Sequence, residues 1–155
     1  MTPAIDFVKK NGISYKVHEY DHKPTSESYG LEAVEQMGVS AAMVFKTLVV
    51  NLDGKELAVG VIPVSSMLSM KCIAKAANAK KAVMAIKSDV VRSTGYVLGG
   101  VSPLGQKRSL RTFIDSSALN HSTMFVSAGR RGLEIELSPS DLEKLVNGEF
   151  VVLCQ

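Results

Sequence analysis

Lys46 is the residue whose surroundings most suggest chemistry, because it lies within an apolar, β-branched run at residues 44–50. The alternation of a strand would place Lys46 on one face with Val44 and Leu48, and both faces of this strand are expected to be at least half buried. An ammonium in such a place loses hydration unless an anion compensates. It is either a strand-edge lysine whose head reaches water, or a cation in a cleft that meets a phosphate, a carboxylate or a developing oxyanion.

A glycine-rich segment at residues 95–105, Gly-Tyr-Val-Leu-Gly-Gly-Val-Ser-Pro-Leu-Gly, is the second candidate. Glycine permits positive φ and lets a ligand approach the backbone, which leaves N–H groups free to bind oxygen atoms. The spacing is neither GxGxxG nor GxxxxGK[ST], so it does not indicate a nucleotide-phosphate loop. A tight structural turn is the competing interpretation.

The third candidate is a glycine-bearing loop expected at residues 127–134, Ser-Ala-Gly-Arg-Arg-Gly-Leu-Glu, between two predicted strands. With Lys107, Arg108 and Arg111 its arginines form a modest basic patch. Such a patch is either a solvated charged turn or a binding site for an RNA end.

Several kinds of catalytic site are missing from the sequence. It contains no G-x-S-x-G elbow, no HExxH and no CxxC pair. His18 and His22 are four residues apart in a stretch that reads as strand running into turn, so no metal site is predicted there. An enzyme built from this chain would therefore work with backbone donors, one lysine and groups of the substrate itself.

The composition limits the class of protein further. The chain has 155 residues, of which 46% are hydrophobic and 21% charged, so it can bury a sizeable core and is not a disordered tail. Its 18 basic and 15 acidic residues give a net charge of only +3, so any contact with a polyanion should be local. No apolar run is long enough to cross a bilayer, no export signal is visible, and two distant cysteines favour a reducing cytosol. We therefore expect a cytoplasmic protein.

Alternating helices and strands must position these residues. Capping residues and helical apolar spacing predict helices at 2–12, 31–38, 70–77, 88–93 and 138–146. Alternation and β-branched runs predict strands at 14–20, 44–50, 57–62, 81–85, 111–115, 123–127, 133–137 and 150–153. The two strongest strands are joined as a hairpin with Asp53-Gly54 at its turn, and a polar loop containing Pro24 covers 21–28. The sequence thus predicts one α+β domain over residues 1–155, built on a mixed sheet with helices around it.

These features in this order resemble the YbaK/EbsC family of aminoacyl-tRNA deacylases, whose fold is shared with the editing domain inserted in bacterial prolyl-tRNA synthetases. The similarity runs almost end to end, through residues 2–4, 45–48, 92–107 and 126–137. The string Ser-Thr-Gly-Tyr…Gly-Gly…Ser-Pro-Leu-Gly-Gln-Lys is long and specific, and it is most similar to the free-standing Cys-tRNA(Pro) deacylases. The resemblance implies a mostly antiparallel, barrel-like sheet surrounded by helices.

The resemblance also implies an activity, namely hydrolysis of the ester between a mischarged amino acid, chiefly cysteine, and the 3′-terminal adenosine of tRNA(Pro). In this family the cysteine thiol of the substrate attacks its own carbonyl. Lys46 would be the catalytic cation. The substrate pocket would be lined by Tyr20, Thr47, Gly99, Gly100, Ser127 and Glu134, and the tRNA would be contacted by Lys107, Arg108, Arg130 and Arg131. The implied partners are tRNA and prolyl-tRNA synthetase, without DNA, membrane, metal or cofactor.

One position departs from the family pattern. Relatives commonly have Asp in Gly-Leu-Asp-Ile-Glu-Leu, whereas this chain has Glu134, whose carboxylate lies one methylene further out. Two other functions remain open. The chain could hold aminoacyl-tRNA or a synthetase without catalysis, although such a module has little need for Lys46 in an apolar strand. It could also deacylate another small amino acid, such as alanine or serine.

Overall fold

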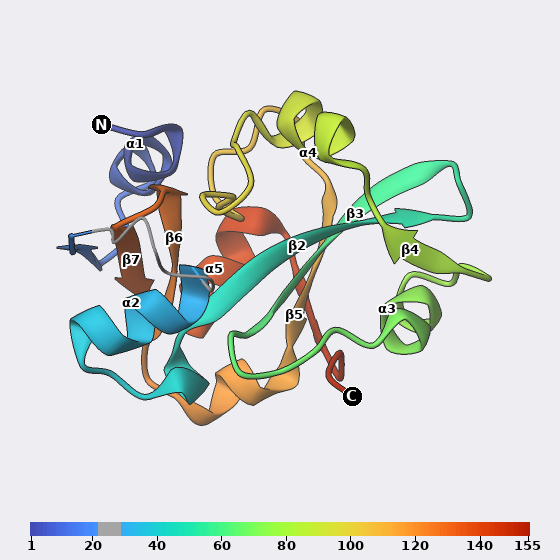
Figure 1. The fold of residues 1–155 in the computed structure, drawn as a ribbon. Helices are drawn as coiled ribbons and strands as arrows, with labels where there is room; N and C mark the ends of the chain where they lie inside the picture. The colour runs from blue at the N-terminus through green and yellow to red at the C-terminus, as the bar shows by residue number, and fades with distance from the viewer. Residues whose placement is uncertain (22–28) are drawn as a thin grey trace.

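Two β-sheets, which meet at one corner, form the framework of the protein (Figure 1). The computed structural model describes residues 1–21 and 29–155. The smaller sheet has the order β1-β7-β6 and consists of β1 (Tyr15–Glu19), β7 (Leu133–Leu137) and β6 (Met124–Arg130). The larger sheet has the order β4-β2-β3-β5-β8 and consists of β4 (Ala82–Met84), β2 (Phe45–Leu52), β3 (Glu56–Pro63), β5 (Arg111–Asp115) and β8 (Glu149–Val151).

The pairing within these sheets is mostly antiparallel, and only β3–β5 and β5–β8 run parallel. In the described parts of the chain, one isolated bridge, between Val44 and Phe125, connects the two sheets. The predicted α+β domain with a mixed, mostly antiparallel sheet is therefore confirmed. Its barrel-like character does not extend to closure in the described part of the chain, because the two sheets keep separate edges.

The predicted hairpin is confirmed and extends along nearly the whole length of β2. Pairing with β3 runs from Phe45–Pro63 to Leu52–Glu56. At the turn Asp53 and Gly54 have positive φ values of 56° and 69°, and the Lys55 N–H donates to the Leu52 carbonyl over 2.9 Å. An Asp-Gly pair tolerates this left-handed backbone, so the turn fixes the register of the hairpin.

Helices cover the sheets close to the positions expected from their caps. They are α1 (Pro3–Lys10), α2 (Tyr29–Met37), α3 (Met70–Ala76), α4 (Lys87–Thr94) and α5 (Pro139–Val146), with short 3₁₀ helices at Ala41–Met43 and Ser116–Asn120. The Thr2 and Ser138 hydroxyls accept from the N–H groups of Ile5 and Asp141, as the Thr-Pro and Ser-Pro pairs predict. The expected polar loop at 21–28, with Pro24 and His22, lies outside the described residues except for Asp21.

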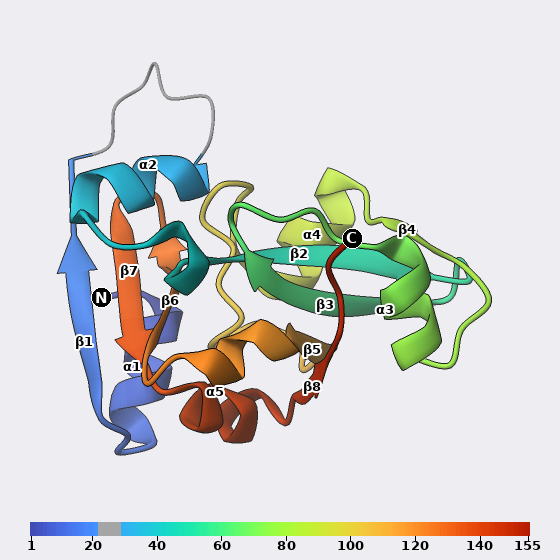
Figure 2. The same cartoon turned by 90° about the horizontal axis from the view of Figure 1, so that it is seen from below.

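The helices α3 and α4 pack on opposite faces of the larger sheet at the end where the β2–β3 hairpin turns (Figure 2). Val90 of α4 belongs to the same core as Val49, whereas Ile73 of α3 packs with Val50. Adjacent residues of β2 thus enter two different cores, as the period of a strand requires. Within the described residues, no helix is long and apolar enough to span a membrane.

Candidate active site

The candidate site lies along a free edge of β2. β3 pairs with one edge of this strand along its whole length. On the other edge, β4 pairs only with residues 50–52, with one further bond from the Ala85 N–H to the Val49 carbonyl, and the Phe125 bridge is at Val44. Residues 46–48 therefore lie in a gap without a strand neighbour on that edge, among the described residues. A cavity of about 430 Å³ occupies this gap, within the size range of small-molecule sites.

Thr47 presents both main-chain and side-chain groups to this cavity. Residues of an antiparallel ladder direct their N–H and C=O groups alternately to the two edges. The Val49 carbonyl points to the β4 edge, where it accepts from Ala85, so the N–H and C=O of Thr47 point to the same edge. The Thr47 Oγ1 is buried and has no hydrogen-bond partner among the described residues. A buried polar group without a partner is costly, so Thr47 is suited to meeting a ligand.

Lys46 supplies a cation to the same cavity. Its side chain is half buried, it lines the cavity, and it forms no ion pair within the described part of the chain. Burial raises the pKa of the Cys154 thiol, and the nearby Lys46 ammonium opposes that rise. A half-buried cation without a carboxylate partner can interact strongly with an anion that enters the cavity.

The opposite wall comes from the smaller sheet, and the carboxyl group in it is mostly uncharged around neutral pH. Glu134 on β7 lies between His18 of β1 and Ser127 of β6 in the sheet and is only 7% exposed. Burial raises the pKa of Glu134 to about 8, and burial together with the charge of Glu134 raises the pKa of Tyr20 to about 12. At pH 7 the Glu134 carboxyl is therefore mostly protonated and can donate a hydrogen bond.

Arg131 closes one end of the cavity against an aromatic ring. Its guanidinium lies 3.8 Å from the ring centroid of Tyr29, and its Nη2 is 3.8 Å from the Glu32 carboxylate. Its Nε and Nη2 are buried without a hydrogen-bond acceptor among the described residues. Gly99 makes room for this arrangement, since its φ is +91° and a Cβ there would lie 2.7 Å from the Tyr29 ring. Arg131 thus has N–H groups left for an anionic or carbonyl oxygen.

Comparison with known proteins identifies the family to which the chain belongs. Residues 23–145 match the family described as "Aminoacyl-tRNA editing domain". The chain is 37% identical, over 96% of its length and 90% of the relative, to an Enterococcus faecalis protein named "Putative Cys-tRNA(Pro)/Cys-tRNA(Cys) deacylase EbsC". The chain belongs to the aminoacyl-tRNA editing domain family. The expectation of an enzyme that edits mischarged aminoacyl-tRNA is thereby confirmed.

Solved structures confirm the fold of the editing domain. One is described as "a putative trans-editing enzyme for prolyl tRNA synthetase"; it has a TM-score of 0.87 and 20% identity, with 99% of this chain and 95% of the other covered. Another, the hypothetical protein APE2540, has a TM-score of 0.84 and 23% identity, with 96% and 98% covered. Both solved structures therefore share this arrangement of two sheets and surrounding helices.

The editing domain brings most of the predicted site residues together. The cavity is lined by the predicted residues Tyr20, Lys46, Thr47, Gly99, Ser127, Arg131 and Glu134. Tyr29, which also lines it, was missed because an aromatic residue at a helix start carries no distinctive sequence signal. Gly100 does not line the cavity; its α-carbon packs against the backbone of Arg130, where a Cβ would lie 2.8 Å from Arg130 Cα.

The predicted basic patch is divided in the structure. Residues 127–134 form a β6–β7 hairpin with a bulge between Ser127 and Arg130, and not the longer loop that was expected. Arg130 is paired with Glu19 on the surface at 3.1 Å, whereas its neighbour Arg131 faces the cavity. Lys107 and Arg108 lie beside the end of α4, where their N–H groups donate to the carbonyls of Thr94 and Ser93.

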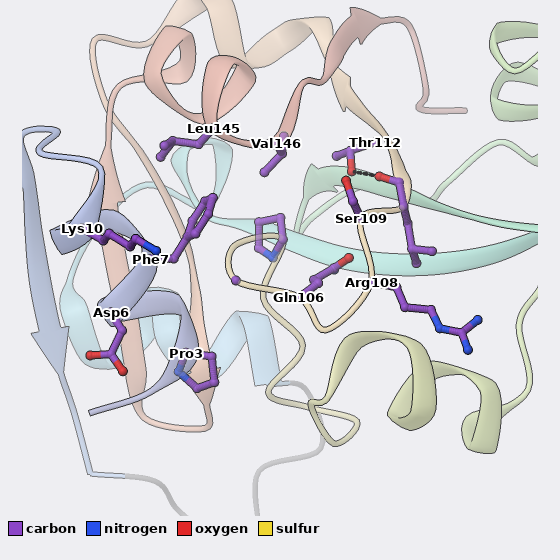
Figure 3. Close-up of a pocket in the computed structure, with 13 residues that line it drawn as sticks. Pro3, Asp6, Phe7, Lys10, Gln106, Arg108, Ser109, Thr112, Leu145 and Val146 are labelled. Carbon is purple, nitrogen blue, oxygen red and sulfur yellow. Dashed lines mark hydrogen bonds between the residues drawn. The ribbon is translucent and has the colours of Figure 1, made fainter.

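A second cavity, of about 390 Å³, lies between α1, the loop at 103–110 and α5 (Figure 3). Arg108 is on its rim, and Figure 3 shows its guanidinium directed away from α1. Both polar and apolar residues line this second cavity, and none of its described lining residues has a buried polar side-chain atom without a partner, which distinguishes it from the Lys46 cavity. Away from both cavities, the His18 Nε2 donates to the Glu136 carboxylate at 2.8 Å. No group of three or more metal-ligating side chains gathers in the described residues.

Proposed function

We propose that this editing domain deacylates mischarged tRNA(Pro), with the cysteinyl ester as its main substrate. The observation that carries the proposal is the gap in the β2 edge, where Lys46 and the open groups of Thr47 face one cavity. The name of the E. faecalis relative supports the cysteinyl ester. Cysteine and proline are close in size, so a synthetase discriminates poorly between them by binding alone, and a second site that removes the error solves that problem.

In the proposed reaction the substrate supplies its own nucleophile. The cysteine sulfur bonds to its own carbonyl carbon, the ester C–O bond breaks, and the thiol proton passes to the 3′ oxygen that leaves with the tRNA. The described lining of the cavity contains no histidine or cysteine, and Ser127 Oγ accepts a hydrogen bond from the Gly129 N–H at 3.1 Å. These observations support a mechanism in which the protein orients the ester and stabilises charge.

Each polar group of the cavity has a proposed part in that mechanism. The Lys46 ammonium and the Thr47 N–H stabilise the oxyanion that develops on the carbonyl. The protonated Glu134 and the Tyr20 hydroxyl donate to the amino acid or sugar. Arg131, which stacks on Tyr29, binds an oxygen of the terminal nucleotide. Prolyl-tRNA synthetase is the proposed partner that delivers the tRNA in the cytoplasm, because a net charge of +3 gives the chain little affinity of its own.

The test is release of labelled amino acid from tRNA(Pro) charged separately with cysteine, alanine and proline, with wild-type protein and Lys46→Ala. We expect rapid loss of cysteine only, and only with wild type. Loss of alanine instead would keep the chemistry and change the specificity. No loss of any amino acid, even with prolyl-tRNA synthetase added, would favour the non-catalytic binding module.

A second substrate tests the nucleophile. A cysteine analogue without the thiol, on the same tRNA, should be hydrolysed poorly because it cannot attack its own carbonyl. Equal rates for the two esters would contradict substrate assistance and indicate an activated water.

A further inference from the structure

Positive charge is concentrated in one segment of this chain. Residues 71–92, which cover α3, β4 and most of α4, hold six basic residues against one acidic residue. The rest of the chain holds 12 basic and 14 acidic residues, so it is slightly negative although the whole protein has a charge of +3. Figure 1 shows α3 and β4 near the end of the β2–β3 hairpin. Asp89 and Arg92 of α4 line a hollow together with Gly54 and Lys55 of the hairpin turn. The net positive charge therefore lies at that end of the molecule.

The lysines at the hairpin end are held by the turn itself. The Asp53 carboxylate accepts hydrogen bonds from the main-chain N–H groups of Lys80 and Lys81, at 2.8–3.2 Å, and the Asp53 N–H donates to the Lys81 carbonyl. These bonds, and the nearby charges of Lys55 and Lys80, hold the pKa of Asp53 below its usual range. The Asp53 carboxylate thus binds main-chain groups and not side chains. The exposed ammonium groups of Lys55, Lys80 and Lys81 form no ion pair among the described residues.

Cations continue from the hairpin end towards the active site. A polar hollow of about 320 Å³ is lined by Lys55, Arg92 and Arg108, together with Asp89, which is paired with Arg92, and Glu56, which is paired with Arg111. Gly95 follows the last residue of α4, and the Lys107 side chain packs beside it. A Cβ built on Gly95 would lie 3.7 Å from the Lys107 Cβ. The chain that leaves α4 then reaches Leu98 and Gly99, which line the Lys46 cavity. Basic side chains thus extend from the hairpin end as far as Gly95, and the uncharged segment that follows lines the Lys46 cavity.

The distance from the cavity to the hairpin end matches a run of nucleotides. Lys46 lies on β2, and Asp53 follows the last residue of that strand. The two residues are seven positions apart, so about 23 Å separate the cavity from the turn at about 3.3 Å per residue. Each strand of a duplex spaces its phosphates by about 3.4 Å along the axis, so this distance spans about seven nucleotides that are stacked as in a duplex. That is longer than the single-stranded 3′ end of a tRNA and reaches its first base pairs.

We propose that Lys55, Lys80, Lys81, Arg92 and Arg108, here called the hairpin-end cluster, bind the phosphate backbone of the tRNA acceptor stem. The inference rests on the proposed function, because it takes the aminoacyl end to lie at Lys46. Contacts of this kind position the tRNA without reading its sequence. The cluster would thus act on many tRNAs alike and leave selection to the cavity and to the synthetase.

The experiment uses the triple variant Lys55→Gln/Lys80→Gln/Lys81→Gln, which removes charge but keeps the N–H groups that Asp53 binds. The control is Lys9→Gln/Lys10→Gln/Lys144→Gln, three exposed lysines on α1 and α5. Fluorescence anisotropy measures binding of uncharged tRNA and of an acceptor-stem minihelix between low and moderate salt. We expect the slope of log K against log salt to fall by about 0.7–0.9 for each lost phosphate contact in the triple variant, and the control to keep the wild-type slope.

Hydrolysis provides the second readout. The triple variant should raise KM for full-length Cys-tRNA and leave hydrolysis of a cysteinyl tetranucleotide of the 3′ end unchanged. Unaltered tRNA binding by the triple variant would overturn the proposal and would favour an acidic protein partner for the cluster. An equal loss of tRNA binding in the control variant would also overturn it. If wild type binds the minihelix through these lysines but cleaves no aminoacyl ester, the proposed function fails and the RNA surface stands.

Discussion

Glu134→Gln should change how the stability of this protein depends on pH. Glu134 is 7% exposed, and burial raises its pKa to about 8 from an ordinary value of 4.5. A carboxyl with a raised folded-state pKa contributes its full stability below the unfolded pKa and loses it as pH rises through the folded pKa. Glutamine has the same shape and cannot ionise, so Glu134→Gln should not lose this stability as pH rises.

The size of the effect follows from the two pKa values. One pH unit corresponds to about 1.4 kcal/mol for each proton that the folded state holds and the unfolded state has released. Over most of the range from pH 5 to pH 8 the Glu134 carboxyl is largely protonated in the folded state. In the unfolded state it is already mostly ionised at pH 5. Integrated over this interval, wild type should lose about 3 kcal/mol of unfolding free energy relative to Glu134→Gln.

Urea unfolding at pH 5, 6, 7 and 8 measures this difference directly. Glu136→Gln is a matched control two residues along β7, because hydrogen bonding to Thr123 and His18 lowers the pKa of Glu136. The stability that Glu136 itself contributes is lost only as pH falls, so the stability difference between wild type and Glu136→Gln should not show the loss of about 3 kcal/mol from pH 5 to pH 8 that is expected relative to Glu134→Gln. A constant difference between wild type and Glu134→Gln over the same range would refute the neutral carboxyl in the cavity wall.

Three further substitutions test the cavity. Lys46→Ala should abolish deacylation with an unchanged circular dichroism spectrum, whereas the exposed Lys16→Ala should keep wild-type turnover; a fully active Lys46→Ala would remove Lys46 from the mechanism. Thr47→Val should leave the unfolding free energy unchanged or higher, because its hydroxyl has no partner, while kcat/KM falls about 2- to 10-fold for one lost hydrogen bond; an unchanged kcat/KM would argue against contact with substrate. Gly99→Ala should destabilise the fold by about 1–3 kcal/mol, and by more than Gly12→Ala, which has a similar positive φ but no neighbour within 4 Å; equal losses in urea unfolding would show that the Tyr29 contact is unimportant.

The local structure could be read from the sequence because short-range signals specify it. The Thr2-Pro3 pair begins α1, and Asp53-Gly54 turns the hairpin, since caps and turns depend on residues only a few positions apart. Lys46 was identifiable for a similar reason, because a lone cation in an apolar strand stands out within seven residues.

The arrangement of the site could not be read in the same way. The cavity exists because β4 and β6 leave β2 uncovered at residues 46–48, and that depends on pairings between distant parts of the chain. Arg130 and Arg131 are neighbours in sequence, yet only Arg131 lines the cavity. The β-bulge at Ser127–Arg130 changes the alternation there, and a bulge of this kind has no strong sequence signature.

The electrostatics of the cavity support a mechanism in which negative charge develops on the substrate. Its acidic group, Glu134, is mostly neutral at pH 7, and Glu32 is already paired with Arg131. The fixed charges that face the cavity are therefore the cations Lys46 of β2 and Arg131 of the β6–β7 turn, and Thr47 follows Lys46 along the same strand. An ionised Glu134 would weaken this field, so its burial serves the chemistry as well as the fold. A shorter Asp at this position would reach less far into the cavity, so the extra methylene of Glu134 narrows the cavity without adding charge.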